Sequence, residues 1–233
     1  MGMSKTYILS FGVILLLGVA SIIGVLHRAS FTPATIGSEE ITETYFSGSV
    51  ATIHGTSVAA LRAQAELTNR LDEFRAQANE QVPALHAQFG PEVPAGHYEI
   101  TLSASVVESA DTETIVISEY RYTGGANGMS TYTTFTSPQK GGSLIALADI
   151  VLPEQKEAFT DIVRTKLQAW AEEREGAMLF TEDVAALTFD SFTNWSVSDE
   201  ALTIYFDKYA VGPGALGTIE LTIPRTELAD FLF

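Results

Sequence analysis

The chain has 233 residues, a length that fits one large domain or two small ones with a hydrophobic core of ordinary size. It carries 13 lysines and arginines against 29 aspartates and glutamates, a formal net charge of -16, and it has no cysteine. This balance argues against a nucleic-acid-binding surface and against docking on anionic lipid, because both need clustered positive charge. The absence of cysteine excludes disulfides, thiolate metal sites and a cysteine nucleophile.

An uncharged apolar stretch occupies residues 7–26, with Lys5 before it and Arg28 after it. At about 1.5 Å per residue, a helix of this length spans the hydrocarbon core of a bilayer. The stretch is longer than the apolar part of an ordinary signal peptide, so we predict a membrane anchor over residues 1–28. The alternatives are a cleaved signal peptide, with the mature chain beginning at Ser21, and a buried core helix.

Residues 29–43 are polar and include Pro33, and we predict a short tether there. The folded part is then residues 44–233. Because Lys5 and Arg28 flank the apolar stretch, 11 basic residues remain in the rest of the chain against all 29 acidic ones, a net charge of -18. The acidity therefore belongs to the part of the chain that follows the predicted anchor.

Within the folded part, residues 44–94 predict a strand followed by a long helix. The stretch 41–53 has β-propensity, and Thr56 and Ser57 are good N-cap residues for a helix. Apolar residues then recur mostly every three, four or seven positions, which predicts an amphipathic helix that ends at Pro83. The positions expected to face the core are Val58, Leu61, Ala65, Leu71, Phe74, Ala78 and Val82.

The middle of the chain predicts β-structure. Apolar and polar residues alternate over residues 97–109 and 113–125, and a third strand-like stretch covers residues 129–137. The links between the three stretches are short and have turn composition. We therefore predict three consecutive strands in an antiparallel meander.

Helical spacing returns after the meander and is followed by further strands. The order of all these elements predicts an α+β fold, an antiparallel sheet with helices packed on one side. The additional predicted elements are a helix over residues 152–175, a short helix near 182–187, and strands over 192–198, 201–209 and 217–224.

Signatures of enzymes are mostly absent from the sequence. The four histidines have no metal-binding spacing, and no nucleophile elbow, phosphate-binding loop or dinucleotide fingerprint is present. We therefore predict a protein that is not an enzyme and that holds no metal or cofactor. The alternative is a hydrolase that uses carboxylates such as Asp149 or Glu182, since acidic residues are plentiful.

The most specific pattern is YRYTGGANG at residues 120–128, followed by LIALADI at residues 144–150. It resembles the YxYTGGAHG and later L-x-D-L motifs of a bacterial domain of unknown function, found in RsiV-type anti-sigma factor ectodomains and in PdaC-type peptidoglycan deacetylases. Residues 202–217 are similar to the strand and the FxPYxVAPYAxG turn of that domain. The resemblance identifies residues 95–233 as the RsiV-like C-terminal half and residues 44–94 as its companion N-terminal half.

This resemblance implies binding rather than catalysis. In RsiV-type proteins the related ectodomain binds lysozyme, and in the deacetylases the domain accompanies a separate catalytic domain. For this chain it implies an extracytoplasmic binding or sensing module of the cell envelope, single-pass in the cell membrane through residues 7–26. Its partner would be a cationic protein such as lysozyme, or peptidoglycan, and the acidic module would attract a cationic partner over long range.

The resemblance also implies a recognition surface formed by the loops after Tyr122 and after Tyr209. This chain departs from the family pattern at Asn127, where the family has His, and at Gly214, where the family has Tyr. The alternative is that the tyrosines and glycines only shape the sheet and its turns. The implied binding residues are Tyr120, Tyr122, Gly124, Gly125, Asn127, Tyr209 and Pro213.

Overall fold

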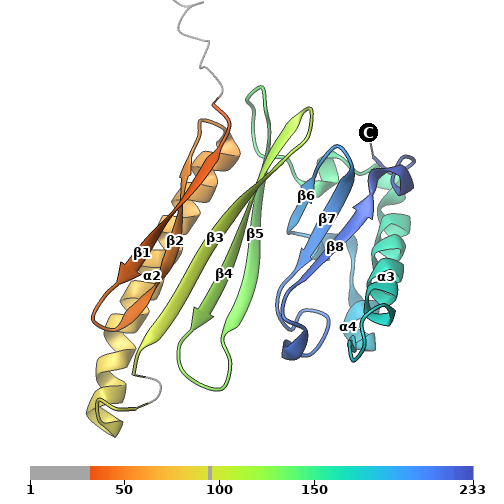
Figure 1. Cartoon of the computed structure of the whole chain (residues 1–233). Helices are drawn as coiled ribbons and strands as arrows, with labels where there is room; N and C mark the ends of the chain where they lie inside the picture. The colour runs from red at the N-terminus through yellow and green to blue at the C-terminus, as the bar shows by residue number, and fades with distance from the viewer. Residues whose placement is uncertain (1–31, 94–95, 233) are drawn as a thin grey trace, which may run out of the picture. The chain divides into compact units, whose positions relative to one another are not determined.

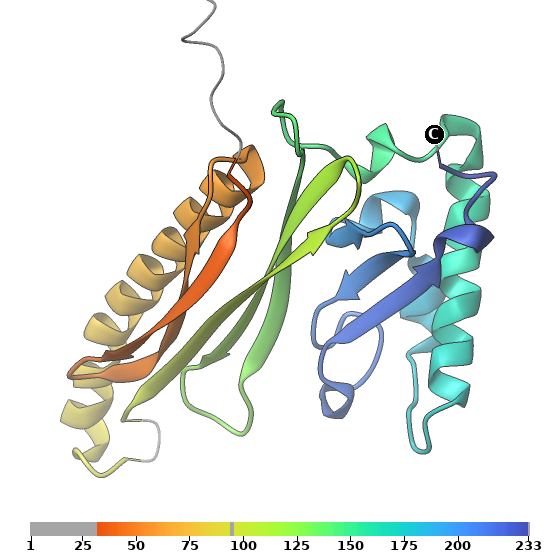
Figure 2. The same cartoon turned by 45° about the horizontal axis from the view of Figure 1, so that its top comes forward.

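The computed structural model describes residues 32–93 and 96–232. The predicted anchor over residues 1–28 and its membrane-spanning stretch lie outside the described residues. Within the described ranges, none of the helices has both the length and the apolar character that crossing a bilayer requires. The described chain contains two β-sheets, each with a helix packed on one face (Figures 1 and 2).

The first sheet has five strands in the order β1-β2-β3-β4-β5. Strands β3, β4 and β5 pair antiparallel, which confirms the predicted meander. Strands β2 and β3 pair parallel, so the prediction of a purely antiparallel sheet is wrong at this point. The reason is the long helix α2 between them, which carries the chain back to the end of the sheet where β2 began. The bounds are β1 Thr35–Thr42, β2 Phe46–His54, α2 Val58–Phe89, β3 Tyr98–Glu108, β4 Thr112–Tyr122 and β5 Met129–Pro138.

Strand β1 lies where the sequence predicted a tether, so that prediction is wrong for residues 35–42. The strand pairs antiparallel with β2 along its whole length, from Thr35 opposite His54 to Thr42 opposite Ser47. All of its side chains except that of Ile41 are exposed. An edge strand of this kind is held by backbone hydrogen bonds, which leave no apolar pattern in the sequence.

Helix α2 begins as predicted and ends later than predicted. The Ser57 hydroxyl accepts a hydrogen bond from the Ala60 N–H at 2.9 Å, so Ser57 is the N-cap. Pro83 lies inside the helix, which continues to Phe89 and stops before Gly90, a residue with a φ of 91°. Pro83 is only two turns from this end, so its missing N–H interrupts the helix without terminating it.

The first two turns of α2 bury a different face from the predicted one. Leu61 is 60% exposed and Ala65 is exposed, whereas Ala63 and Leu67 are fully buried against the sheet. Small alanine side chains let the helix approach the strands closely, so in these turns the face that carries alanine packs on the sheet and the face that carries Leu61 does not. From Phe74 onward the predicted core positions are buried as expected: Phe74, Ala78 and Val82.

The second sheet has three antiparallel strands in the order β6-β7-β8 and a hydrophobic core of its own. Helix α3 packs on this sheet, and both the helix and the strands confirm the elements predicted there. The expectation of one sheet is therefore corrected to two, because the chain leaves β5 and builds its last strands around α3. The bounds are α3 Lys156–Glu172, α4 Thr181–Ala186, β6 Trp195–Val197, β7 Ala201–Phe206 and β8 Ile219–Pro224.

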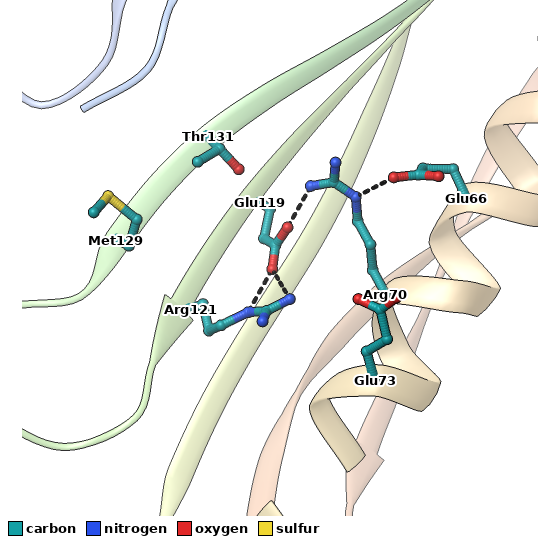
Figure 3. A pocket seen from close by; sticks show the side chains of 7 residues that line it. All are labelled: Glu66, Arg70, Glu73, Glu119, Arg121, Met129 and Thr131. Atoms are coloured by element: carbon teal, nitrogen blue, oxygen red, sulfur yellow. Dashed lines mark hydrogen bonds and ion pairs between the residues drawn. The ribbon is translucent and has the colours of Figure 1, made fainter. Parts of the chain in front are cut away.

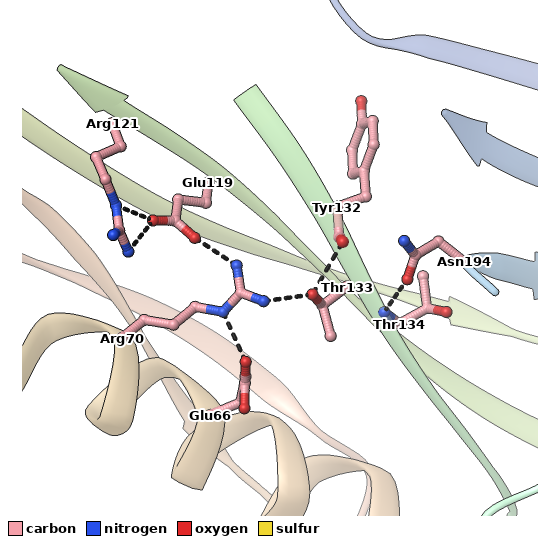
Figure 4. Close-up of polar contacts among 8 residues, drawn as sticks. All are labelled: Glu66, Arg70, Glu119, Arg121, Tyr132, Thr133, Thr134 and Asn194. Atoms are coloured by element: carbon pink, nitrogen blue, oxygen red, sulfur yellow. Dashed lines mark hydrogen bonds and ion pairs between the residues drawn. The ribbon is translucent and has the colours of Figure 1, made fainter. Parts of the chain in front are cut away.

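The second sheet meets the first along β5, which is the last strand of the five-stranded sheet. The Tyr132 N–H donates to Asp207 Oδ1 at 2.7 Å. The Thr134 N–H donates to Asn194 Oδ1 at 3.2 Å (Figure 4). Polar side chains thus satisfy backbone groups of an edge strand that would otherwise be free to pair with another chain.

Two leucines of α2 test which helix face is buried. We expect Leu67→Ala to lower the free energy of unfolding by about 3 kcal/mol, because Leu67 is fully buried. Leu61→Ala should change it by no more than about 0.5 kcal/mol, because Leu61 is exposed. Urea unfolding followed by circular dichroism measures both, and equal losses would contradict this orientation of the helix.

Candidate functional site

The last residues of strand β4 place charged side chains on one face of the sheet and tyrosines on the other. Glu119 faces α2 and forms an ion pair with Arg70 of that helix. Because side chains alternate along a strand, Arg121 shares this face, whereas Tyr120 and Tyr122 point to the other one. The sequence motif therefore contributes to two separate sites.

The loops after β4 and β7 come together, as the resemblance implied. The Lys208 ammonium donates to the Gly128 carbonyl at 2.7 Å, and the Lys208 N–H donates to the Ser130 carbonyl at 3.0 Å. Within the first loop, the Tyr122 hydroxyl donates to the Gly125 carbonyl at 3.1 Å. We call the residues gathered here the loop surface: Tyr120, Tyr122, residues 123–128, Lys208, Tyr209, Pro213 and Gly214.

Glycines of the loop surface give room to two tyrosine rings. A Cβ at Gly128 would lie 2.3 Å from the Tyr120 ring, and a Cβ at Gly214 would lie 2.4 Å from the Tyr209 ring. Both contacts are too short for any other residue without a shift of the ring. Gly125 has a φ of 105°, a left-handed conformation that favours glycine.

Tyr209 is the unusual residue of the loop surface. Its φ of 72° is the one positive value at a non-glycine position in the described part of the chain. Its side chain is 46% exposed, and the Lys208 ammonium lies 5.3 Å from the centre of its ring. A bulky residue held in this conformation costs about 1 to 2 kcal/mol, and such strain is concentrated at functional sites.

The other residues predicted for binding lie in the same two loops. Gly124 has a φ of 88°, and Asn127 is exposed between it and β5. Pro213 precedes the short 3-10 turn η4 (Gly214–Leu216) and accepts the Leu216 N–H through its carbonyl. The structure thus places the predicted residues in two loops that Lys208 joins, and their role in binding stays a prediction.

A second feature, which we call the charged cleft, lies between α2 and strands β4 and β5 (Figure 3). The Arg70 Nε donates to Glu66 Oε1 at 2.7 Å, and another Arg70 nitrogen donates to Glu119. The Arg121 Nε donates to the other Glu119 oxygen at 2.7 Å. The cleft has a volume of about 360 Å³ and is lined by Glu66, Arg70, Glu73, Glu119, Arg121, Met129 and Thr131.

The charges in the cleft neutralise one another. Burial lowers the pKa of Arg70, but the hydrogen bond that it donates to Glu66 and the charge of Glu119 outweigh this effect, so the pKa is raised overall. A third Arg70 nitrogen donates to Thr133 Oγ1 at 2.6 Å, which ties the helix to β5 (Figure 4). Each of the three guanidinium nitrogens therefore has a protein partner.

Sequence reasoning missed this network, although one signal was present. The buried face of β4 carries Ile115 and Ile117, and the alternation continues directly to Glu119. A buried carboxylate needs a hydrogen-bond donor or a cationic partner, so the pattern predicts a polar contact from the element packed on this face. The partner itself, Arg70, could not be identified without the packing of α2.

The carboxylates proposed for the enzymatic alternative lie elsewhere. Asp149 Oδ2 accepts the Ala146 N–H at 2.8 Å, and Glu182 is exposed in the first turn of α4. Neither of them lines the charged cleft. Among residues 32–93 and 96–232, no group of three or more histidines and carboxylates is placed to hold a metal ion.

Two sheets, each backed by a helix and joined along β5, define a two-sheet α+β domain. Residues 148–226 match the family described as Protein of unknown function (DUF3298). The matched residues include α3 and the three-stranded sheet with Tyr209 and Pro213. The motif at residues 120–128 lies before them.

Solved structures share this fold. A DUF3298 family member from Bacteroides fragilis has a TM-score of 0.59 and 17% identity, and one from Pseudomonas aeruginosa PAO1 has a TM-score of 0.59 and 21% identity. Each alignment covers 86% of this chain and 94% of the other. At these identities the likeness concerns the fold.

A curated relative is the peptidoglycan-N-acetylmuramic acid deacetylase PdaC of Bacillus subtilis, 26% identical over 140 residues. The alignment covers 58% of this chain and 29% of that protein, so the chain spans less than a third of its relative. The resemblance drawn from the sequence is thereby confirmed, as a match to DUF3298 over residues 148–226 and a distant homology to PdaC.

Two arginines of α2 test the energetic role of the charged cleft. Arg70→Leu leaves Glu119, which is 7% exposed, with Arg121 as its one remaining cationic partner, and should lower the free energy of unfolding by about 2 kcal/mol. Arg75→Leu removes exposed ion pairs with Glu43 and Asp72 and should cost no more than about 1 kcal/mol. Equal losses of unfolding free energy in the two variants would show that the buried ion-pair network stabilises the fold no more than the exposed pairs do.

Asp207 provides a test against pH. Burial raises the pKa of its carboxyl above the ordinary value of 3.8; the Tyr132 N–H and the charge of Arg70 oppose this rise, and the charge of Glu119 adds to it. The folded chain therefore holds this proton more tightly than the unfolded chain does. The resulting stability is fully present below pH 3.8 and is lost as the pH rises through the raised pKa.

Asp207→Asn keeps an oxygen that can accept the Tyr132 N–H and removes the buried charge. We expect this variant to be more stable than the parent chain at neutral pH, with a gain that shrinks as the pH falls toward 3.8. Urea unfolding at a series of pH values measures the difference. A variant that is less stable at neutral pH would mean that the Asp207 carboxylate is stabilising.

Proposed function

We propose that the chain is a membrane-anchored, extracytoplasmic binding module of the bacterial cell envelope, and that its loop surface recognises a cationic protein such as a lysozyme. The observation that carries the proposal is Tyr209, a half-exposed ring presented from a strained backbone. The ring lies against Gly214, and Lys208 joins its loop to Gly128. A rigid, exposed aromatic side chain is the usual anchor of a protein interface.

The charge of the chain supports a basic partner. The residues other than Lys5 and Arg28 comprise 11 basic and 29 acidic ones, a net charge of -18. A surface of this sign accelerates the encounter with a cationic protein and repels anionic ones. Exposed aromatic side chains of the loop surface, Tyr120 and Tyr209, supply area that can be desolvated on binding.

The relation to PdaC supports a place in the cell envelope, because the printed name of that protein is a peptidoglycan deacetylase. The alternative is a wall-acting hydrolase or a deacetylase-associated enzyme that uses surface carboxylates such as Asp149 or Glu182. Turnover of peptidoglycan by the purified chain, abolished by Asp149→Asn or Glu182→Gln, would favour that alternative over binding.

The strain at Tyr209 allows binding to be separated from folding. Tyr209→Gly removes the ring and places at a φ of 72° the residue that tolerates it best. We expect the dissociation constant for a cationic lysozyme to rise about tenfold or more, while the free energy of unfolding stays within about 1 kcal/mol. Calorimetric titration of the full-length chain measures the first quantity, and urea unfolding measures the second.

Phe89→Ala is the matched control, because Phe89 is 61% exposed at the end of α2 and lies outside the loop surface. It should leave lysozyme binding unchanged. The affinity should also fall between about 50 mM and about 500 mM salt, since exposed charges are screened. Absence of binding, or equal losses in the Tyr209 and Phe89 variants, would refute recognition by the loop surface.

A further inference from the structure

The faces of the two sheets that are not covered by α2 and α3 both carry polar side chains. On β4, Ser118 and Tyr120 lie on the face opposite to the buried side chains. On β8, Glu220 and Thr222 likewise lie on the face opposite to the core. A cleft of about 160 Å³ lies where these faces approach each other. We call it the polar cleft, and it is lined by Ser103, Ala104, Ser105, Val116, Ser118, Tyr132, Tyr205 and Glu220.

The three serines of the polar cleft have free hydroxyl groups. Ser103 and Ser105 are exposed on β3, and Ser118 is half-buried on the neighbouring strand. None of these hydroxyls has a hydrogen-bond partner within the part of the chain that the structure describes. Three unpartnered groups that can both donate and accept are thus aligned along one side of the cleft.

Two tyrosines and a carboxylate form the other side. The rings of Tyr132 and Tyr205 have their centres 4.9 Å apart at an angle of 50°. The Tyr132 hydroxyl donates to Glu220 Oε1 at 2.7 Å, and the Tyr205 hydroxyl lies 2.9 Å from Ser196 Oγ. Burial raises the pKa of Tyr132 to about 12, so the phenol keeps its proton and orients the carboxylate at neutral pH.

This combination of groups fits a sugar. Aromatic rings pack against the apolar face of a pyranose, and serine hydroxyls exchange hydrogen bonds with sugar hydroxyls. A volume of about 160 Å³ admits one six-membered ring. No basic side chain lines the cleft, so the Glu220 carboxylate favours a ligand with a positive charge and disfavours an anionic one.

We propose that the polar cleft binds one residue of an amino-sugar glycan whose amine is free and protonated. The ammonium group pairs with Glu220, the sugar hydroxyls reach Ser103 and Ser118, and the ring lies against Tyr205. This site is separate from the loop surface and does not depend on recognition of a cationic protein there.

A matched pair of ligands tests the proposal. Oligomers of glucosamine and of N-acetylglucosamine differ at the amine, which is charged in the first and acetylated in the second. We expect the full-length chain to bind the glucosamine oligomer at least about tenfold more tightly in calorimetric titration, because only that oligomer can form the ion pair. Equal affinity for the two oligomers, or no binding of either, would overturn the proposal.

Variants locate the site. Glu220→Gln keeps an oxygen that accepts the Tyr132 hydroxyl, so the fold is preserved, and it should weaken binding of the glucosamine oligomer about tenfold. Glu80→Gln removes an exposed carboxylate on α2 and should leave binding unchanged. Ser118→Ala should weaken binding of both oligomers through the lost hydrogen bond.

The controls separate this site from general attraction to an acidic chain and from the loop surface. Equal weakening by Glu220→Gln and Glu80→Gln would mean that the oligomer responds to net charge, and would overturn the proposal. Tyr209→Gly should leave binding of the oligomer intact, because Tyr209 does not line the polar cleft. Loss of oligomer binding in this variant would place the sugar on the loop surface instead.

Discussion

The loop surface and the polar cleft both depend on the hydrogen bonds that join the second sheet to the edge of β5. Its N–H groups at Tyr132 and Thr134 lie next to the second sheet, where an unpaired buried amide costs about 1 to 3 kcal/mol. Asn194, just before β6, and Asp207, just after β7, supply the two acceptors from the same end of this antiparallel pair. Because these contacts fix the second sheet against β5, they also bring Lys208 to the Gly128 carbonyl.

Because one of the two acceptors at the edge of β5 is the carboxylate of Asp207, the contact has an electrostatic cost, which Arg70 of the charged cleft partly offsets. Burial disfavours the charge of Asp207, and the nearby charge of Arg70 favours it. Arg70 also contacts Glu119 of β4 and Thr133 of β5, so one guanidinium supports the helix, two strands and the closing carboxylate. The charged cleft, although it carries several charged side chains, therefore has a structural role: its arginine helps to hold the two sheets together.

The sequence predicted the elements that have strong local patterns and missed those that depend on distant partners. Alternation located β3 and β4, and helical spacing located α3, because buried apolar residues leave a period in the sequence. Strand β1 left none, since its side chains are exposed and its stability comes from pairing with β2. The closing contact of Asp207 with Tyr132 joins residues 75 positions apart, which no local pattern can reveal.

The difference between satisfied and unsatisfied groups is the best guide to where this domain binds. In the charged cleft, Arg70 and Glu119 each have protein partners for their charged atoms, so a ligand would have to break existing ion pairs to enter. At the polar cleft, the hydroxyls of Ser103 and Ser118 have no such partners among the residues that the structure describes, and at the loop surface the Tyr209 ring is exposed on a strained backbone. Ligands gain most where the protein has left groups unpaired, which favours these two surfaces over the more highly charged one.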